Sequence, residues 1–115
     1  MKINELAKHF IENESMPWEE VENGIQRKVI AYDEKLMLVK VRFESGMVGT
    51  IHKHHHSQIT HVESGVFEIE ISGEKRVLKR GDAYYIPPDT LHGAVCIADG
   101  VLIDVFSPMR EDFIK

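Results

Sequence analysis

The stretch that decides the fold is residues 46–65, which read GMVGTIHKHHHSQITHVESG. It holds five of the chain's seven histidines, and its centre is the triplet His52-Lys53-His54. Side chains two positions apart on a β-strand point to the same face of the sheet. On a strand, the His52 and His54 imidazoles would therefore lie side by side. Two adjacent imidazoles can begin a site for a first-row transition metal.

The residues on both sides of this stretch alternate between apolar and polar, as half-buried strands do. The apolar members are Met37, Val39, Val41 and Phe43 before it, and Phe67, Ile69 and Ile71 after it. Glycines at 65, 73 and 81 predict strands of five or six residues joined by tight turns. Residues 101–106 read as a last strand, closed by Pro108. Many short strands predict an all-β fold, an antiparallel barrel or jelly roll whose interior can hold one small ligand.

The beginning of the chain has a different period. Residues 3–13 predict a short amphipathic α-helix, with Ile3, Leu6, Ala7, Phe10 and Ile11 on its apolar face. Pro17 ends this pattern. We therefore expect one domain over residues 1–115, with a helical extension over 1–17 and a β-barrel over 18–115. The apolar face of the helix must cover either the barrel or a neighbouring chain.

The composition narrows the classes of partner. The chain has 115 residues and a formal charge of -5, which argues against nucleic acid or an anionic membrane, because such partners require clustered Lys and Arg. The longest apolar run, Ala94–Ala98, is too short to span a bilayer, and Met1–Phe10 lacks the apolar core of a secretory signal. Cys96 is the lone cysteine. We therefore expect a cytoplasmic protein without an internal disulfide.

Two further side chains extend the candidate metal site. Gln58 follows His54 by four residues, and His92 comes much later in the chain. Three imidazoles and one oxygen donor suit a divalent transition metal, and zinc, nickel, iron and copper all accept such ligands. Glutamine is neutral, so the ion would keep one more positive charge than beside a glutamate. That favours Lewis-acid chemistry over redox cycling.

The other histidines are weaker candidates for metal ligands. His55 has the opposite parity to His52 and His54, and His61 has the opposite parity to Gln58, so both are expected to face outward. His9 lies between core positions of the predicted helix and is expected at the surface. His56 remains open between a supporting role behind the ligands and contact with the bound molecule.

Two spaced motifs resemble those of the cupin family. Gly46, His52, His54, Gln58 and Gly65 fit G-x5-H-x-H-x3,4-E-x6-G, the first cupin motif. The second motif, G-x5-P-x-G-x2-H-x3-N, is met by Gly81, Pro87 and His92, and 15 residues separate the two. Three positions depart from the motifs: Gln58 replaces glutamate, Asp89 replaces glycine and Cys96 replaces asparagine.

The C-terminal segment narrows this resemblance to the KdgF-type cupins. Residues 102–113 look like the end of those proteins, and residues 27–30, 36–41 and 84–87 look like other segments of them. The resemblance implies ring opening of 4,5-unsaturated uronates to linear 4-deoxy-5-keto uronates, in the breakdown of pectin or alginate. It implies metal ligands at His52, His54, Gln58 and His92. It also implies active-site residues at Asp104, Phe106 and Arg110.

The residues themselves give Asp104 a separate argument. Leu102, Asp104 and Phe106 share one face of the last predicted strand, and a carboxylate on an inward face is costly unless it is paired or functional. We expect Asp104 to transfer protons, Arg110 to hold a substrate carboxylate and Phe106 to wall the pocket. The alternatives are a surface or ion-paired Asp104, a surface Arg110 and a purely structural Phe106.

Three other functions fit the same residues. The first is a metal-dependent isomerase or dioxygenase that acts on another small sugar or acid. The second is a module that binds a sugar acid without converting it, and the third is a structural cupin without metal. In each case we expect a homodimer, since small cupins often pair and sheet edges favour pairing.

Overall fold

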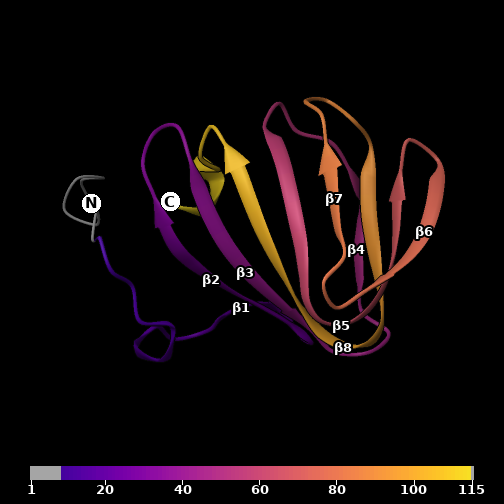
Figure 1. Ribbon diagram of the computed structural model, residues 1–115, viewed down its shortest axis with the longest axis horizontal. Helices are drawn as coiled ribbons and strands as arrows, with labels where there is room; N and C mark the ends of the chain where they lie inside the picture. The colour runs from indigo at the N-terminus through magenta and orange to yellow at the C-terminus, as the bar shows by residue number, and fades with distance from the viewer. Residues whose placement is uncertain (1–8, 115) are drawn as a thin grey trace.

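The computed structural model describes residues 9–114, and these form one eight-stranded antiparallel sheet that folds over on itself (Figure 1). The strands are β1 (Glu19–Glu22), β2 (Ile25–Tyr32), β3 (Met37–Phe43), β4 (Val48–His52), β5 (Ser57–Ile71), β6 (Glu74–Lys79), β7 (Ala83–Ile86) and β8 (His92–Ser107). Two 3-10 turns, η1 (Asn13–Ser15) and η2 (Glu111–Phe113), flank them. The predicted all-β class is confirmed.

Two long strands, β5 and β8, hold the two halves of the sheet together. Residues 57–64 of β5 pair with β7 and with the second half of β8, which in turn pairs with β3. Residues 66–71 of β5 pair with β6 and with the first half of β8, which in turn pairs with β4. Figure 1 shows both long strands bending where these halves meet, with β2 and β3 to one side and β4 and β6 to the other.

Glycines make this bend possible. The predicted turns at Gly73 and Gly81, with a six-residue strand between them, are confirmed, but the predicted turn at Gly65 is wrong. Gly65 lies inside β5 at a register shift with φ +82°, so it marks a bulge rather than a turn. A Cβ on Gly65 would lie 2.5 Å from the carbonyl oxygen of Asp99, and a Cβ on Gly100 would overlap the carbonyl of Ser64. The two backbones therefore approach so closely that β5 and β8 continue through the bend as single strands.

Gly100 should tolerate alanine far less well than Gly73 does. Gly73 sits in a hairpin turn with φ +84° and open space around it, so alanine there adds only backbone strain of about 1–2 kcal/mol. Alanine at Gly100 meets backbone atoms, and we expect it to lower the free energy of unfolding by about 3 kcal/mol or more. Urea unfolding of both variants measures the difference, and equal losses would contradict the close approach.

The predicted alternation sets the core. Met37, Val39 and Phe43 are buried, whereas Leu36 is 54% exposed. Two apolar clusters result, one of Ile25, Phe43, Val62, Phe67, Ile69, Cys96 and Leu102, and one of Met37, Val39 and Phe106. Phe106 belongs to the second cluster, so core packing holds this candidate site residue in place.

The predicted N-terminal helix falls mostly outside the described residues. Residues 9–12 are not helical, and Asn13–Ser15 forms a single 3-10 turn, so the prediction of an α-helix that reaches residue 13 is wrong. Lys28 Nζ donates hydrogen bonds to Asn13 O at 3.0 Å and Asn13 Oδ1 at 3.3 Å, which ties this turn to β2. Among residues 9–114 there is no helix long and apolar enough to cross a membrane.

Candidate active site

Three of the four predicted metal ligands converge at one end of the folded sheet. His52 ends β4 and lies opposite His92, which begins β8, while His54 follows in the loop before β5. The nearest ligand atoms of the three side chains all lie within 4.8 Å of one another. Their ring centroids are 4.5–5.6 Å apart. The fold thus gathers histidines from distant parts of the chain into one cluster.

Hydrogen bonds to backbone carbonyls orient two of these imidazoles. His52 Nδ1 lies 2.8 Å from the Thr50 carbonyl oxygen, and His92 Nδ1 lies 2.8 Å from that of Thr90. A ring that donates from Nδ1 keeps a free lone pair on Nε2. Burial, reinforced by the charge of Arg110, lowers the pKa of His54 to about 4. Burial likewise lowers the pKa of His92, and the lowered pKa values favour the neutral imidazoles that metals bind.

Gln58 places an amide oxygen beside the histidine cluster. Its side chain is buried, and its Oε1 lies 3.0 Å from His54 Nε2. Two donors bound to one ion at about 2.1 Å each lie roughly 3 Å from one another. The spacing of the imidazoles, the lone pairs left on Nε2 of His52 and His92, and this amide oxygen together fit a first-row transition metal.

Asp104 lies beside this cluster. Leu102, Asp104 and Phe106 are all buried, so the predicted inward face of the strand is confirmed. Thr60, opposite Asp104 in the β5–β8 register, donates a 2.6 Å hydrogen bond from Oγ1 to Asp104 Oδ1. Burial raises the pKa of Asp104 to about 6, against the Thr60 hydrogen bond and the charge of Arg110, which lower it. A carboxyl group with this pKa can both accept and release a proton near neutral pH.

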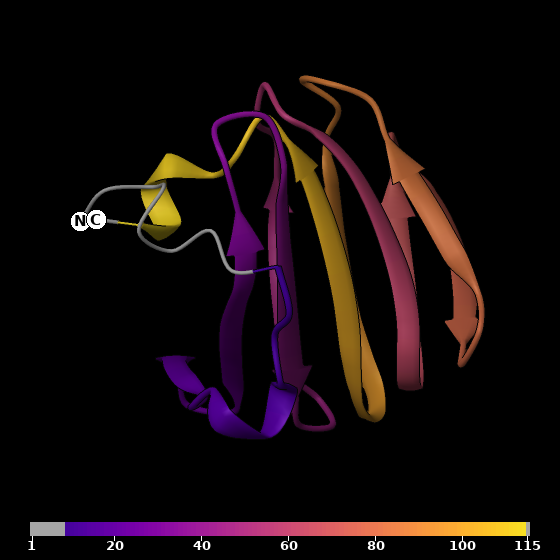
Figure 2. The same ribbon diagram turned by 60° about the vertical axis from the view of Figure 1, so that its left-hand side comes forward.

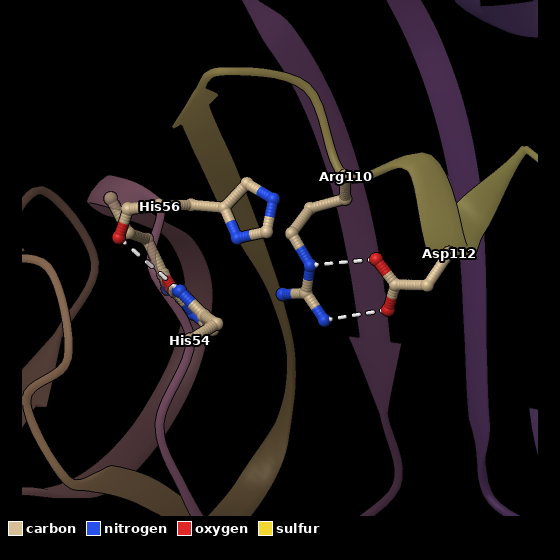
Figure 3. A network of polar contacts seen from close by, with 5 residues as sticks. His54, His56, Arg110 and Asp112 are labelled. Carbon is tan, nitrogen blue, oxygen red and sulfur yellow. Dashed lines mark hydrogen bonds and ion pairs between the residues drawn. The ribbon is translucent and has the colours of Figure 1, made fainter.

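Arg110 faces the same space from the chain segment after β8. Its Nε and Nη2 donate to the two carboxylate oxygens of Asp112, at 3.1 and 2.9 Å. Figure 3 shows the third guanidinium nitrogen pointing away from Asp112, toward His56 and His54. The guanidinium carbon lies 5.1 Å from the Phe106 ring centre and 4.4 Å from that of Phe113. One edge of Arg110 is thus already occupied, and the other remains available to a ligand.

A cavity of about 270 Å³ joins these groups. The candidate residues on its wall are His52, Gln58, His92, Asp104, Phe106 and Arg110. Its volume lies just below the range of about 300–1,000 Å³ usual for ligand pockets, as expected for one small molecule. A hollow of about 350 Å³ between residues 10–17 and β2 contains none of these candidates.

The remaining histidines divide as the sequence indicated, apart from one. His9, His55 and His61 are exposed. His56, which the sequence left open, is buried next to His54, and both its ring nitrogens lack a hydrogen-bond partner among the described residues. Ligand atoms of His55, His56 and Glu111 also lie within 4.8 Å of one another.

Four residues at the site were not among the sequence candidates. Thr60 shares the parity of Gln58 on β5, which could have placed it on the inner face. Burial and the Asp104 charge raise the pKa of Tyr84, a second cavity residue, so its phenol stays protonated. Asp112 and Phe113 belong to the C-terminal turn, which Figure 2 shows beside β2, where Phe113 contacts Arg27.

Comparison with known proteins places the chain in a family. Residues 39–106 match the cupin domain family. The chain is 50% identical over 111 residues to the pectin degradation protein KdgF of Dickeya dadantii, covering 95% of this chain and 100% of that protein.

Two solved structures agree with this match. KdgF from Halomonas sp. superposes with a TM-score of 0.88 at 49% identity, over 90% of this chain and 98% of that one. An RmlC-like cupin from Shewanella frigidimarina gives a TM-score of 0.90 at 41% identity, over 93% of this chain and 96% of that one. The protein is therefore a member of the cupin family, and within it of the KdgF group.

Proposed function

We propose that this chain is an enzyme that opens the ring of 4,5-unsaturated uronates to linear 4-deoxy-5-keto uronates, in the breakdown of pectin and related polyuronates. Its 50% identity to a pectin degradation protein supports the pathway. The observation that carries the proposal is the Asp104 carboxylate, buried in the same cavity as the histidine cluster. A module that only binds its ligand has no need for a proton-transfer group there.

His52, His54, His92 and Gln58 would hold one divalent transition metal ion, which can be zinc, nickel, iron or copper. When bound, the ion supplies positive charge to the carboxylate and to the oxygen that becomes an enolate. Because Gln58 is neutral, it leaves that charge undiminished. The amide therefore suits an anionic substrate.

Asp104 performs the proton transfers in this proposal. The substrate is a cyclic hemiacetal whose ring oxygen is bonded to an alkene carbon that carries the carboxylate. Asp104 removes the proton from the anomeric hydroxyl, a C1 carbonyl forms, and the bond from C1 to the ring oxygen breaks. The ring oxygen departs as an enolate, and Asp104 returns the proton to C4 to give the ketone. Atoms balance, since the reaction is an isomerisation.

Arg110 and Phe106 position the substrate. The Arg110 edge that Asp112 leaves open donates to the substrate carboxylate. Phe106 closes the cavity beside Asp104 and keeps water from the reacting atoms, since it is 2% exposed and packed in the core.

The test is incubation of the metal-loaded protein with an unsaturated uronate monomer. The conjugated double bond absorbs in the ultraviolet, and we expect its absorbance to fall faster than in the spontaneous reaction. A chelator should abolish the acceleration, and restored metal should return it. No acceleration with metal confirmed bound would overturn the proposal.

Asp112 should affect substrate binding through Arg110. Asp112→Asn leaves one oxygen to accept from the guanidinium, so Arg110 is oriented less well. We expect KM to rise about 5- to 10-fold with a smaller change in kcat, which corresponds to roughly 1 kcal/mol. Glu111→Gln removes a neighbouring exposed carboxylate and is the matched control. Equal KM values for the two variants would argue against this role.

We also propose that two copies pair through the outer face of β4, β8 and β6. Val48, Val95 and Val77 lie in one cross-strand row with Glu68, and each valine is at least 36% exposed. Among the residues described here, β4 pairs only with β8, which leaves an edge for association. Light scattering should give twice the mass of one chain.

A cytoplasmic location stays a prediction that rests on the lone cysteine.

A further inference from the structure

We propose that Thr60 is a positioning residue for the reaction and that it determines which oxygen of Asp104 exchanges protons with the substrate. This inference rests on the proposed function, because it concerns the carboxylate that performs the ring opening. It adds a residue at a variable position of the first cupin motif, between Gln58 and Gly65, and assigns the reacting atom.

A directed chain of hydrogen bonds carries the inference. Gln58 Nε2 donates to Thr60 Oγ1 at 2.9 Å, and Thr60 Oγ1 donates to Asp104 Oδ1 at 2.6 Å. Thr60 is 0% exposed, so no solvent competes for its hydroxyl. A hydroxyl has a single proton to donate. The Tyr84 phenol is a further hydrogen-bond partner of Thr60, but the Gln58 amide supplies a proton to Oγ1 and the 2.6 Å contact gives the hydroxyl proton to Asp104.

The hydrogen bond from Thr60 makes the two carboxylate oxygens of Asp104 different. Asp104 Oδ1 accepts from Thr60 and lies 3.5 Å from a second donor, Gln58 Nε2. No described residue donates a hydrogen bond to Oδ2, and Asp104 is part of the cavity wall. Thr60 therefore fixes the carboxylate by one oxygen and leaves Oδ2 as the atom that meets the substrate. Such orientation matters, since a displacement of about 1 Å in a reacting group can cost about 100-fold in rate.

The same chain explains why an amide suits position 58. Gln58 Oε1 faces His54 Nε2 at 3.0 Å, while its Nε2 faces Thr60. A glutamate could supply an oxygen to a metal ion but has no N–H for Thr60. The single Thr60 proton would then lie between two carboxylates, and Asp104 would no longer be held alone. Gln58 thus connects the metal site to the proton-transfer group.

The first experiment compares Thr60→Val with Thr60→Ser in the metal-loaded protein. Valine has nearly the same shape but no hydroxyl, and we expect kcat to fall about 10- to 100-fold. KM should change by less than about 3-fold, and metal content should stay at the wild-type value. Serine restores the hydroxyl and should return kcat to within about 3-fold. Wild-type kcat in Thr60→Val, or equal losses in both variants, would overturn the proposal.

Gln58→Glu is the second variant, and it leaves Thr60 in place should Thr60→Val fail to fold. We expect it to keep its metal and to lose kcat by about 10-fold or more. Full activity with full metal content would overturn the proposal.

Crystal structures test the positioning role of Thr60 independently of the proposed function. If the wild type does not open uronate rings, the proposed function fails. The orientation of Asp104 in crystals of wild type and Thr60→Val still tests the positioning role, and an unchanged carboxylate orientation in the variant would contradict it.

Discussion

Replacing Asp104 with asparagine is expected to lower kcat for ring opening by about 10²–10⁴-fold, the usual contribution of a positioned general base. Asparagine keeps the shape of the side chain and can still accept the hydrogen bond from Thr60 Oγ1, but it cannot take a proton. Metal content and KM should change little, because Asp104 is not among the donors of the histidine cluster. Initial rates followed by ultraviolet absorbance, with metal analysis of the same sample, measure the effect.

Asp89→Asn is the matched control for this substitution. Asp89 is exposed and adopts φ +58°, a conformation that asparagine tolerates well, so the variant should fold and act like the wild type. If Asp104→Asn keeps its rate within about 3-fold of Asp89→Asn while metal is bound, the proton moves through another group. Tyr84 would then be the nearest candidate, since its protonated phenol also lines the cavity.

Part of the histidine cluster and the buried faces of the strands could be predicted because they depend on local patterns. His52 and His54 are two positions apart, and the structure places their rings 5.6 Å from one another. The expectation that both lie on a strand is wrong for His54, which follows β4 in a loop. The alternation from Met37 to Phe43 gave the correct buried face. Such patterns need no knowledge of which strand pairs with which. His92, by contrast, joins the cluster through the pairing of β4 with β8, and the second cupin motif indicated it.

The hydrogen-bond chain at Asp104 depends on pairing, which local patterns do not contain. Thr60 meets Asp104 only because β5 and β8 pair in one register, across 44 positions of sequence. Its parity with Gln58 indicates the inner face, but a threonine on a strand is ordinary by propensity, so its type does not mark it as part of a site. The occupied edge of Arg110 was missed for a different reason. Asp112 is only two residues away, but its contact depends on the turn that η2 makes.

Replacing His92 with alanine is expected to remove metal binding and, with it, the acceleration of ring opening. His92 is buried, lies opposite His52 in the sheet and holds its Nδ1 on Thr90 O, so no neighbouring side chain can take its place. Loss of an outer partner of a metal ligand costs about 10- to 100-fold in affinity, and loss of the ligand itself should cost more. Metal analysis and the ultraviolet assay measure both consequences.

Thermal unfolding separates this effect from a general loss of stability. A metal at about 100 times its Kd stabilises the folded chain by about 2.7 kcal/mol, which raises Tm by on the order of 10 °C. The wild type and His61→Ala, whose altered side chain is exposed on the same strand as Gln58, should both show this rise. His92→Ala should not. A metal-dependent rise in Tm that survives in His92→Ala would place the ion elsewhere, and the grouping of His55, His56 and Glu111 would be the next location to examine.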